Sequence, residues 1–263
     1  MTELVFTDTG WEKKTYVMGI INATPDSFSG DGINGNIEAG VSQALSFYSE
    51  GADILDIGGE STRPQSLYGN VKDISGKEEI NRVVPLVKEI RARSGGMISV
   101  DTSKSAVADA AIKAGANMVN DVWALKKDPE MVEVVASAKV YVVLMHNDSN
   151  PSYSDVVYDT IESLKKSVDK AVMDGIPEDL IIIDPGIGFG KDMHQNLTIL
   201  RRLEEYKSIG RPILVGTSRK STIGNILQVP VHERTYGTAA SIAIAIAKGT
   251  NIAVSYTHLR AHE

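Results

Sequence analysis

Short apolar runs rich in β-branched residues recur along this chain, and most of them end in a polar cluster. Eight of these runs predict β-strands, near residues 16–22, 53–58, 97–101, 118–122, 140–145, 180–184, 212–217 and 251–255. Strands that stay apolar until their last residues are typical of a parallel sheet that is buried on both faces. When many such strands follow one another, their polar ends converge on one rim, where a functional site can form.

Patterns typical of helices lie between the predicted strands, near residues 37–50, 77–93, 104–115, 129–138, 155–174, 192–207 and 233–248. Strand–helix alternation with short connections predicts parallel pairing and right-handed crossovers. Eight strands therefore favour one α/β domain over residues 1–263, a (β/α)8 TIM barrel, with an open doubly wound sheet as the alternative. Residues 3–6 and 13–16 flank Asp8-Thr-Gly10 and predict an N-terminal β-hairpin.

The composition excludes several classes of protein. The chain has no cysteine, which excludes disulfides, thiolate metal sites and thiol nucleophiles. Its net charge of −7 argues against general nucleic-acid binding. No apolar run approaches the roughly 20 residues that cross a bilayer. The N-terminus lacks the basic and then apolar pattern of a secretion signal. We therefore expect a cytoplasmic protein without nucleic-acid or membrane partners.

The polar clusters belong to longer motifs that share a place at or after a predicted strand end. They read Met18-Gly-Ile-Ile-Asn-Ala-Thr-Pro-Asp-Ser-Phe-Ser29, Asp56-Ile-Gly-Gly-Glu-Ser-Thr-Arg-Pro64, Ser99-Val-Asp-Thr102, Asn120-Asp121, Asp184-Pro-Gly-Ile-Gly-Phe-Gly190 and Ser218-Arg-Lys-Ser221. Together they bring carboxylates, amides, glycines and cations to one expected rim.

In this order and at this spacing, the motifs resemble those of the dihydropteroate synthase family, over about residues 14–252. The resemblance implies a (β/α)8 barrel enzyme, a transferase of folate biosynthesis that is usually a homodimer. Members join 6-hydroxymethyl-7,8-dihydropterin pyrophosphate to p-aminobenzoate, which gives 7,8-dihydropteroate and pyrophosphate. Mg²⁺ accompanies the pyrophosphate, and sulfonamides compete for the p-aminobenzoate site.

The resemblance implies a pterin site made by residues at five strand ends, namely Asp101, Asn120, Met145, Asp184 and Lys220. A buried carboxylate accepts from two adjacent N–H groups, and an asparagine offers both a donor and an acceptor. Two alternatives stay open. Asp101 could instead cap the helix that follows it. Asp56 and Asp121 are as well suited to hydrogen bonds with other site residues as to ligand contact.

By the same resemblance, the pyrophosphate is expected at Asn22, Thr62 and Arg63. Arg63 can bind phosphate oxygens with two N–H groups at once, and Asn22 offers an oxygen to Mg²⁺. The residues expected around p-aminobenzoate are Phe28, Thr62, Pro64, Phe189 and Ser221. Ser221 lies where a helical turn can begin, and its hydroxyl and nearby N–H groups suit the carboxylate.

Three further residues leave alternatives open. Phe189 could pack in the core instead of beside the ligand. His146 suits the core and a ligand wall equally well, and Arg219 could pair with a neighbouring carboxylate. The segment 65–76 looks longer than usual for the family, which could alter closure over p-aminobenzoate.

The hypothesis for the reaction is a dissociative substitution at the exocyclic methylene of the pterin, with Arg63, Lys220 and Asp101 as catalytic residues. Pyrophosphate leaves as Mg²⁺ and Arg63 stabilise its charge, and the neutral arylamine then attacks. Two other functions remain as alternatives. One is a pterin-binding methyltransferase domain, and the other is a catalytically impaired pterin-binding protein.

The last residues depart from the family pattern, which has an arginine and a histidine where this chain has Val254 and Tyr256. Residues 254–263 resemble translated adapter sequence. We therefore expect a non-native tail over these residues, the final helix of the barrel to be missing, and the homodimer to belong to the full-length form.

Overall fold

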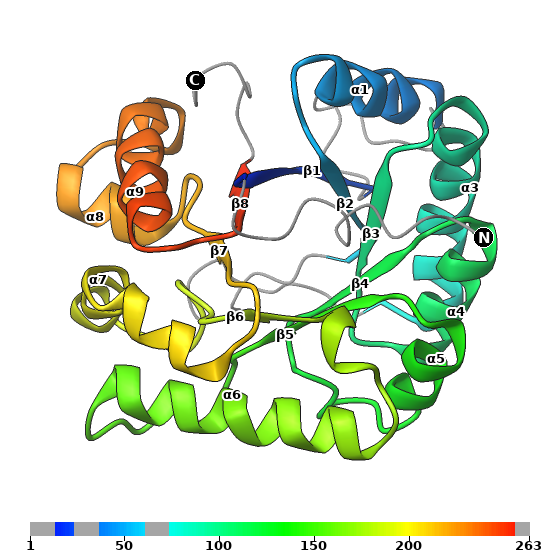
Figure 1. Cartoon of the computed structure of the whole chain (residues 1–263). Coiled ribbons are helices and arrows are strands. Elements are labelled where there is room, and N and C mark those ends of the chain that lie inside the picture. Colours follow the sequence, from blue (N-terminus) through cyan, green and yellow to red (C-terminus); the bar gives the residue numbers. More distant parts are fainter. Residues whose placement is uncertain (1–13, 24–36, 61–73, 256–263) are drawn as a thin grey trace.

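The strands form a barrel at the centre of the computed structural model, which describes residues 14–23, 37–60 and 74–255 (Figure 1). They are β1 (Tyr16–Asn22), β2 (Ile54–Gly58), β3 (Met97–Asp101), β4 (Met118–Asp121), β5 (Tyr141–Met145), β6 (Ile181–Asp184), β7 (Leu214–Gly216) and β8 (Ile252–Ser255). All their pairings are parallel, in the order β6-β5-β4-β3-β2-β1-β8-β7.

The two edges of this sheet meet, which closes the barrel. A parallel bridge joins Ile183 of β6 to Ile213 beside β7, and the Ile183 N–H donates to the Pro212 carbonyl at 2.9 Å. The predicted TIM barrel is therefore confirmed, and the open doubly wound alternative is wrong, because its outer strands would not meet.

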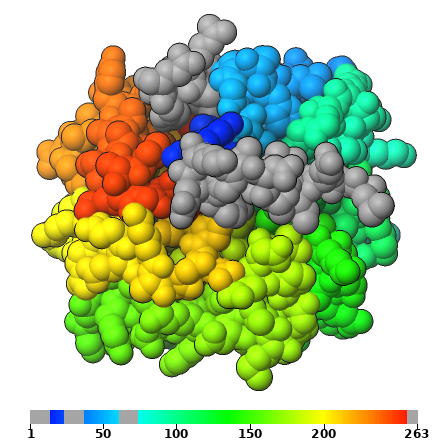
Figure 2. Space-filling model, viewed as in Figure 1, coloured from blue at the N-terminus to red at the C-terminus, as the bar shows by residue number. Residues whose placement is uncertain are grey.

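Helices surround the strands on all sides (Figure 1). They are α1 (Ile37–Ser49), α3 (Gly76–Arg93), α4 (Ser105–Ala114), α5 (Met131–Ala138), α6 (Val156–Met173), α7 (Met193–Arg201), α8 (Ser221–Leu227) and α9 (Thr235–Ala247), with 3₁₀ turns η1 (Glu178–Leu180), η2 (Leu203–Ile209) and η3 (Val231–Glu233). Their side chains fill the periphery from α1 (blue) round to α9 (red) in the space-filling view (Figure 2).

The segment predicted as one helix over residues 192–207 forms two elements. The α-helix α7 ends at Arg201, and the 3₁₀ turn η2 follows it. Leu203 and Tyr206 are fully buried and lie three residues apart. Three residues make one turn of a 3₁₀ helix, so the tighter winding places both on the same inward face. The Tyr206 hydroxyl shares a hydrogen bond with Thr160 at 2.5 Å, which joins this turn to α6.

Two apolar layers hold the barrel together. One lies between the strands and the helices, and includes Ile57, Val87, Ile98 and Leu144. The other fills the barrel interior with alternate residues of the strands and with Leu180, which directly precedes β6. Its members are Tyr16, Met18, Ile54, Met97, Met118, Tyr141, Val143, Leu180, Ile182, Leu214, Ile252 and Val254. Alternation along each strand sends neighbouring residues to opposite faces, which produces the two layers.

The inward-facing rows change from apolar to polar toward the carboxyl ends of the strands. Two residues beyond Ile54 the row reaches Asp56, and two beyond Met118 it reaches Asn120. The row of Ile182 likewise ends at Asp184. The site residues therefore continue the barrel interior upward instead of lying on its outer face.

Several expectations fall outside the described residues. The N-terminal hairpin depends on residues 1–13, and the missing final helix and the non-native tail depend mainly on residues 256–263. Val254 is described, and it packs in the barrel interior beside Gly216 and Met18. No helix in the described part is both long and apolar enough to span a membrane.

Candidate functional site

Strand register brings the predicted polar residues to one rim. Asn22 pairs with Gly58, Gly58 with Asp101, and Asp101 with Asn120, across four neighbouring strands. On the next two strands, Met145 of β5 pairs with Asp184 of β6. Because all strands are parallel, these side chains lie at the same end of the barrel.

Asn120 is oriented by Asp56, which lies one step deeper in the barrel. The Asn120 Nδ2 group donates to Asp56 Oδ2 at 2.9 Å, which leaves the amide oxygen of Asn120 as an acceptor. Burial raises the pKa of Asp56, while hydrogen bonds from Ser99 and Asn120 lower it. Asp56 thus orients the Asn120 side chain. Asp121 instead accepts from the N–H groups of Trp123 and Leu125, at 2.9 and 2.7 Å, and stabilises the turn that follows β4.

Asp101 ends β3, three residues before the N-cap of α4 at Lys104. The first turn of α4 is bonded by other residues, because the Lys104 N–H donates to Thr102 Oγ1 at 3.2 Å and the Ser105 N–H donates to Asp128 Oδ2 at 2.7 Å. Asp101 lies against Gly58, where a Cβ atom would be 3.6 Å from Asp101 Oδ2. Asp101 is half-buried at the rim.

Asp184 and Lys220 form the charged part of the site. Asp184 is 7% exposed, and its Oδ1 accepts from the Gly186 N–H at 2.7 Å. Burial raises the pKa of Asp184, and the charge of Lys220 opposes that rise. Burial lowers the pKa of Lys220 to about 8, against the opposing effect of Asp184. The rim therefore holds opposite charges in a partly desolvated place.

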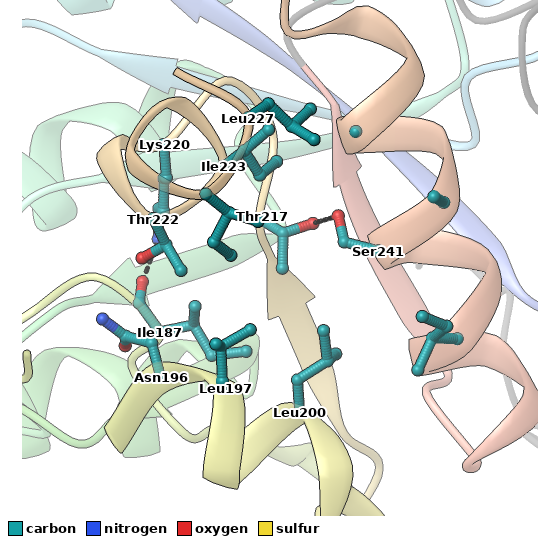
Figure 3. Close-up of a pocket in the computed structure, with 14 residues that line it drawn as sticks. Ile187, Asn196, Leu197, Leu200, Thr217, Lys220, Thr222, Ile223, Leu227 and Ser241 are labelled. Carbon is teal, nitrogen blue, oxygen red and sulfur yellow. Dashed lines mark hydrogen bonds between the residues drawn. The ribbon is translucent and has the colours of Figure 1, made fainter. Parts of the chain in front are cut away.

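The glycine-rich turn after β6 reaches Lys220 from the other side. Gly186, Gly188 and Gly190 have positive φ angles of 71°, 87° and 57°, a conformation that favours glycine. A Cβ atom on Gly188 would lie 2.8 Å from Lys220 Cδ. The Lys220 ammonium donates to the Ile187 carbonyl (Figure 3) and lies 4.7 Å from the centre of the Phe189 ring.

Phe189 is half-buried and belongs to neither apolar layer, so its alternative role in core packing is wrong. Its ring faces a cation, which is a favourable arrangement for an aromatic face. Phe189 therefore forms part of the wall around Lys220.

Lys220 and Ser221 lie on a turn that α9 supports. Ser221 begins α8, as expected. Arg219, at a φ of 54°, donates its N–H to Thr238 Oγ1 at 3.1 Å and accepts at its carbonyl from Arg234 Nη1 at 2.9 Å. The alternative of an Arg219–carboxylate pair is absent from the ion pairs of the described residues, and the Arg219 backbone holds the turn.

Phe28, Thr62, Arg63 and Pro64 lie outside the described residues, so the structure does not place them. The two ends of the segment that carries Arg63 are joined through Glu60. Its carboxylate accepts from the Ile74 N–H at 2.9 Å and from Lys104 Nζ at 2.6 Å.

The sequence did not single out Lys191, which directly follows the glycine-rich motif. Its ammonium contacts carbonyls of that motif and the buried His146. Burial, together with the charges of Lys191 and Lys126, lowers the pKa of His146 to about 3, so the imidazole is neutral. A lysine that ends a glycine-rich turn is the one signal that could have drawn attention to it.

A separate apolar cavity of about 250 Å³ lies between α7, α8 and α9 (Figure 3). Leu197, Leu200, Ile223 and Ile244 contribute to its walls, and of the predicted pterin residues Lys220 alone borders it. The cavity is therefore distinct from the rim where the polar residues converge.

Comparison with known proteins agrees with this architecture. The family model described as "Pterin binding enzyme" matches residues 18–254. The dihydropteroate synthase of Bacillus subtilis is 45% identical over 242 residues, which cover 92% of this chain and 83% of that protein. The one from Clostridium beijerinckii is 46% identical over 236 residues, with 90% and 86% covered.

Solved structures give the same result. A dihydropteroate synthase from Clostridium difficile, in the presence of pteroic acid, superposes with a TM-score of 0.91 at 41% identity and covers 98% of this chain and 95% of that one. The Xanthomonas albilineans enzyme with 4-aminobenzoic acid gives 0.89 at 39% identity, with 95% and 89% covered. The chain therefore belongs to the pterin-binding enzymes and, within them, to the dihydropteroate synthase family.

Proposed function

We propose that this chain is a transferase of folate biosynthesis that joins 6-hydroxymethyl-7,8-dihydropterin pyrophosphate to p-aminobenzoate. The observation that carries the proposal is the convergence of Asn22, Asp101, Asn120, Asp184 and Lys220 on one rim of the barrel. Relatives of the same family have been solved with 4-aminobenzoic acid and with 7,8-dihydropteroate, which supports both halves of the reaction.

In this proposal the pterin ring lies over the polar layer of the barrel. The Asp184 carboxylate accepts from the aminopyrimidine edge, while Asp101 and Asn120 bond the remaining polar atoms of the ring. Lys220 donates to a ring acceptor, and Met145, which is 3% exposed beside Asp184, forms an apolar wall. The hydrogen bond from Asn120 Nδ2 to Asp56 supports this arrangement, because it turns the amide oxygen of Asn120 toward a ligand N–H.

The pyrophosphate is assigned to Asn22, Thr62 and Arg63, with Mg²⁺ beside it. Within the described residues, no three His, Cys, Asp or Glu side chains gather as a metal cluster. That fits a Mg²⁺ carried mainly by phosphate and water, since this ion commonly takes only one or two protein oxygens. The amide oxygen of Asn22, at the end of β1, would supply one. When bound, the ion would neutralise charge that develops on the leaving pyrophosphate.

The chain's own contribution to the reaction is orientation and electrostatic stabilisation. Arg63 binds the leaving group, while Asp101 and Lys220 hold the ring as its exocyclic methylene becomes positive and pyrophosphate departs. The p-aminobenzoate lies among Phe28, Thr62, Pro64 and Phe189, with its carboxylate at Ser221. Its neutral amine attacks the methylene and then loses a proton, so no strong general base is required.

For the full-length form, the proposal includes a homodimer through α8, η3 and α9. Five large apolar side chains along this stretch have exposed fractions between 46% and 89%. They are Ile226, Leu227, Val231, Tyr236 and Ile244. Apolar surface of this kind commonly marks a protein interface. Sedimentation of the full-length form at several concentrations tests this part independently of catalysis.

The test of the function is to incubate the protein with both substrates and Mg²⁺ and to measure pyrophosphate and dihydropteroate. Equal amounts of the two products are expected. Methyl transfer from a folate donor, without dihydropteroate, would instead identify the methyltransferase alternative. Tight pterin binding without any product would identify an impaired pterin-binding protein.

A further inference from the structure

Lys191 is a partly buried lysine for which the proposed reaction has no use. Its ammonium donates to the carbonyls of Gly186 and Phe189 at 3.0 and 2.9 Å. It also lies 3.3 Å from the carbonyl of His146 and 3.1 Å from His146 Nδ1. One cation thus contacts four acceptors that come from two segments, the end of β5 and the turn after β6.

These contacts close a turn that comes very near its neighbour. A Cβ atom on Gly186 would lie 2.0 Å from the His146 carbonyl oxygen, so glycine alone fits there. The backbone of the two segments is further joined by the His146 N–H, which donates to the Asp184 carbonyl at 2.8 Å. Carbonyl dipoles that point at one another repel, and a cation placed among them removes that cost.

The same turn serves a second lysine. Its Gly186 and Phe189 carbonyls accept from Lys191, whereas its Ile187 carbonyl accepts from Lys220. The Gly186 N–H, at the start of this turn, donates to Asp184 Oδ1 at 2.7 Å. A change in the turn at Lys191 therefore alters the positions of both charged groups of the pterin site.

We infer that Lys191 is a positioning residue for the pterin site, which holds the Gly186–Gly190 turn so that Asp184 and Lys220 face the ligand. The inference rests on the proposed function, and it adds to that function a residue that does not contact the substrate. Lys191 acts through three backbone carbonyls and one imidazole nitrogen, all of them outside the set assigned to pterin.

The surrounding charges are compatible with this role. Burial and the charge of Lys220 lower the pKa of Lys191 to about 7, while Asp184 and Asp148 oppose that effect. His146 is neutral, because burial lowers its pKa to about 3. A neutral imidazole can accept at Nδ1 from the ammonium, with its proton on Nε2.

The experiment compares Lys191→Met, which keeps the length of the side chain but removes its donors, with the same substitution at Lys170. The Lys170 side chain is 73% exposed on α6 and serves as the matched control. We expect Lys191→Met to raise the KM for the pterin pyrophosphate at least tenfold, with a smaller change in the KM for p-aminobenzoate. Lys170→Met should leave both unchanged.

Nitrogen-15 NMR of the His146 imidazole supplies a readout that activity does not. Nδ1 should resemble an acceptor in the parent protein, and its resonance should move in Lys191→Met. A variant with parent-like KM values, or an unmoved His146 resonance, would overturn the inference. If Lys191→Met does not fold, Lys191→Gln replaces it, and an unchanged affinity for the pterin in that variant would equally overturn the role.

Failure of the proposed function gives a different result. The affinity for a pterin, measured by fluorescence quenching, does not depend on turnover. A parent protein that binds pterin but makes no dihydropteroate contradicts the proposed reaction. In that case a weaker pterin affinity in Lys191→Met still supports the positioning role.

Discussion

The lower and upper parts of the barrel interior are built by the same rows of inward-facing side chains but differ in polarity. The lower part is apolar and fully buried, as at Met18, Ile54 and Met118. The upper part, two residues further along, holds Asp56, Asn120 and other polar groups. Burial of the apolar lower part stabilises the fold, whereas burial of the polar upper part disfavours the charged forms of its side chains. The residues that stabilise the barrel and the residues proposed to bind the ligand therefore occupy successive positions along the same strands.

The largest expected effect is that of replacing Lys220, which should change activity and stability in opposite directions. Lys220→Met should lower kcat/KM by at least 100-fold, because an ammonium beside the ligand is lost. It should also stabilise the fold at pH 7 by up to about 3 kcal/mol, since the pKa of this lysine is lowered to about 8 in the folded state. Turnover assays and urea denaturation measure the two changes, and a variant that loses both activity and stability would contradict the comparison.

The pH dependence of that stability difference has a fixed sign. The folded protein binds fewer protons at Lys220 than the unfolded chain between pH 8 and about 10.5. The cost of Lys220 is therefore complete below pH 8 and is relieved as the pH rises through that window. The advantage of Lys220→Met should shrink accordingly.

The opposite result is expected in the lower interior. Met118 is fully buried among the apolar strand residues, and Met118→Ala should destabilise the fold by about 3 kcal/mol through loss of burial and formation of a cavity. Its KM values should stay within about twofold of the parent. Met173→Ala is the control, because Met173 is 85% exposed and should change stability by less than about 0.5 kcal/mol.

Val254 lies where the two parts meet and tests how far the polar layer extends. A Cβ atom on Gly216 would be 3.5 Å from Val254 Cβ and 3.8 Å from Lys220 Nζ, so Val254 is close to the charged part of the site. The family resemblance implies an arginine at this position. Val254→Arg should raise kcat/KM for the pterin pyrophosphate about tenfold by adding a charge-assisted contact. A fall in activity, with Val172→Arg on α6 as the control for added charge, would contradict that alignment.

The smallest effect concerns the alkaline limb of the pH profile. Lys220 should lose its proton near pH 8, so kcat/KM should fall by several-fold between pH 7 and pH 9. Lys220→Arg keeps a charge throughout this range and should flatten the limb even where its rate is lower. A limb that is unchanged in Lys220→Arg would assign the titration to another group.

Strand ends and helix positions could be predicted because they depend on periodicity and on local turn residues. The eight strands lie where the apolar runs indicated; Asp101 and Asp184 end their strands, and Asn120 lies one residue before the end of β4. The roles of Asp56 and Asp121 could not be separated, because both follow apolar runs and only register shows that Asp56 faces inward beside Asn120.

Contacts between segments distant in the sequence were the part that could not be predicted. Lys191 and His146 are 45 residues apart, and no local pattern relates them. The support of Arg219 by Thr238 and Arg234 of the α9 region is of the same kind. Such contacts depend on how the glycine-rich turn and the helices pack against the strands, which periodicity does not encode.

The most direct test of the account is a crystal structure of this chain with pteroic acid bound. We expect the pterin ring over the upper interior of the barrel, with its polar edge about 3 Å from Asp184 and Asn120 and with Lys220 beside it. A pterin ring in the apolar cavity between α7, α8 and α9, or on the outer surface of the barrel, would contradict it.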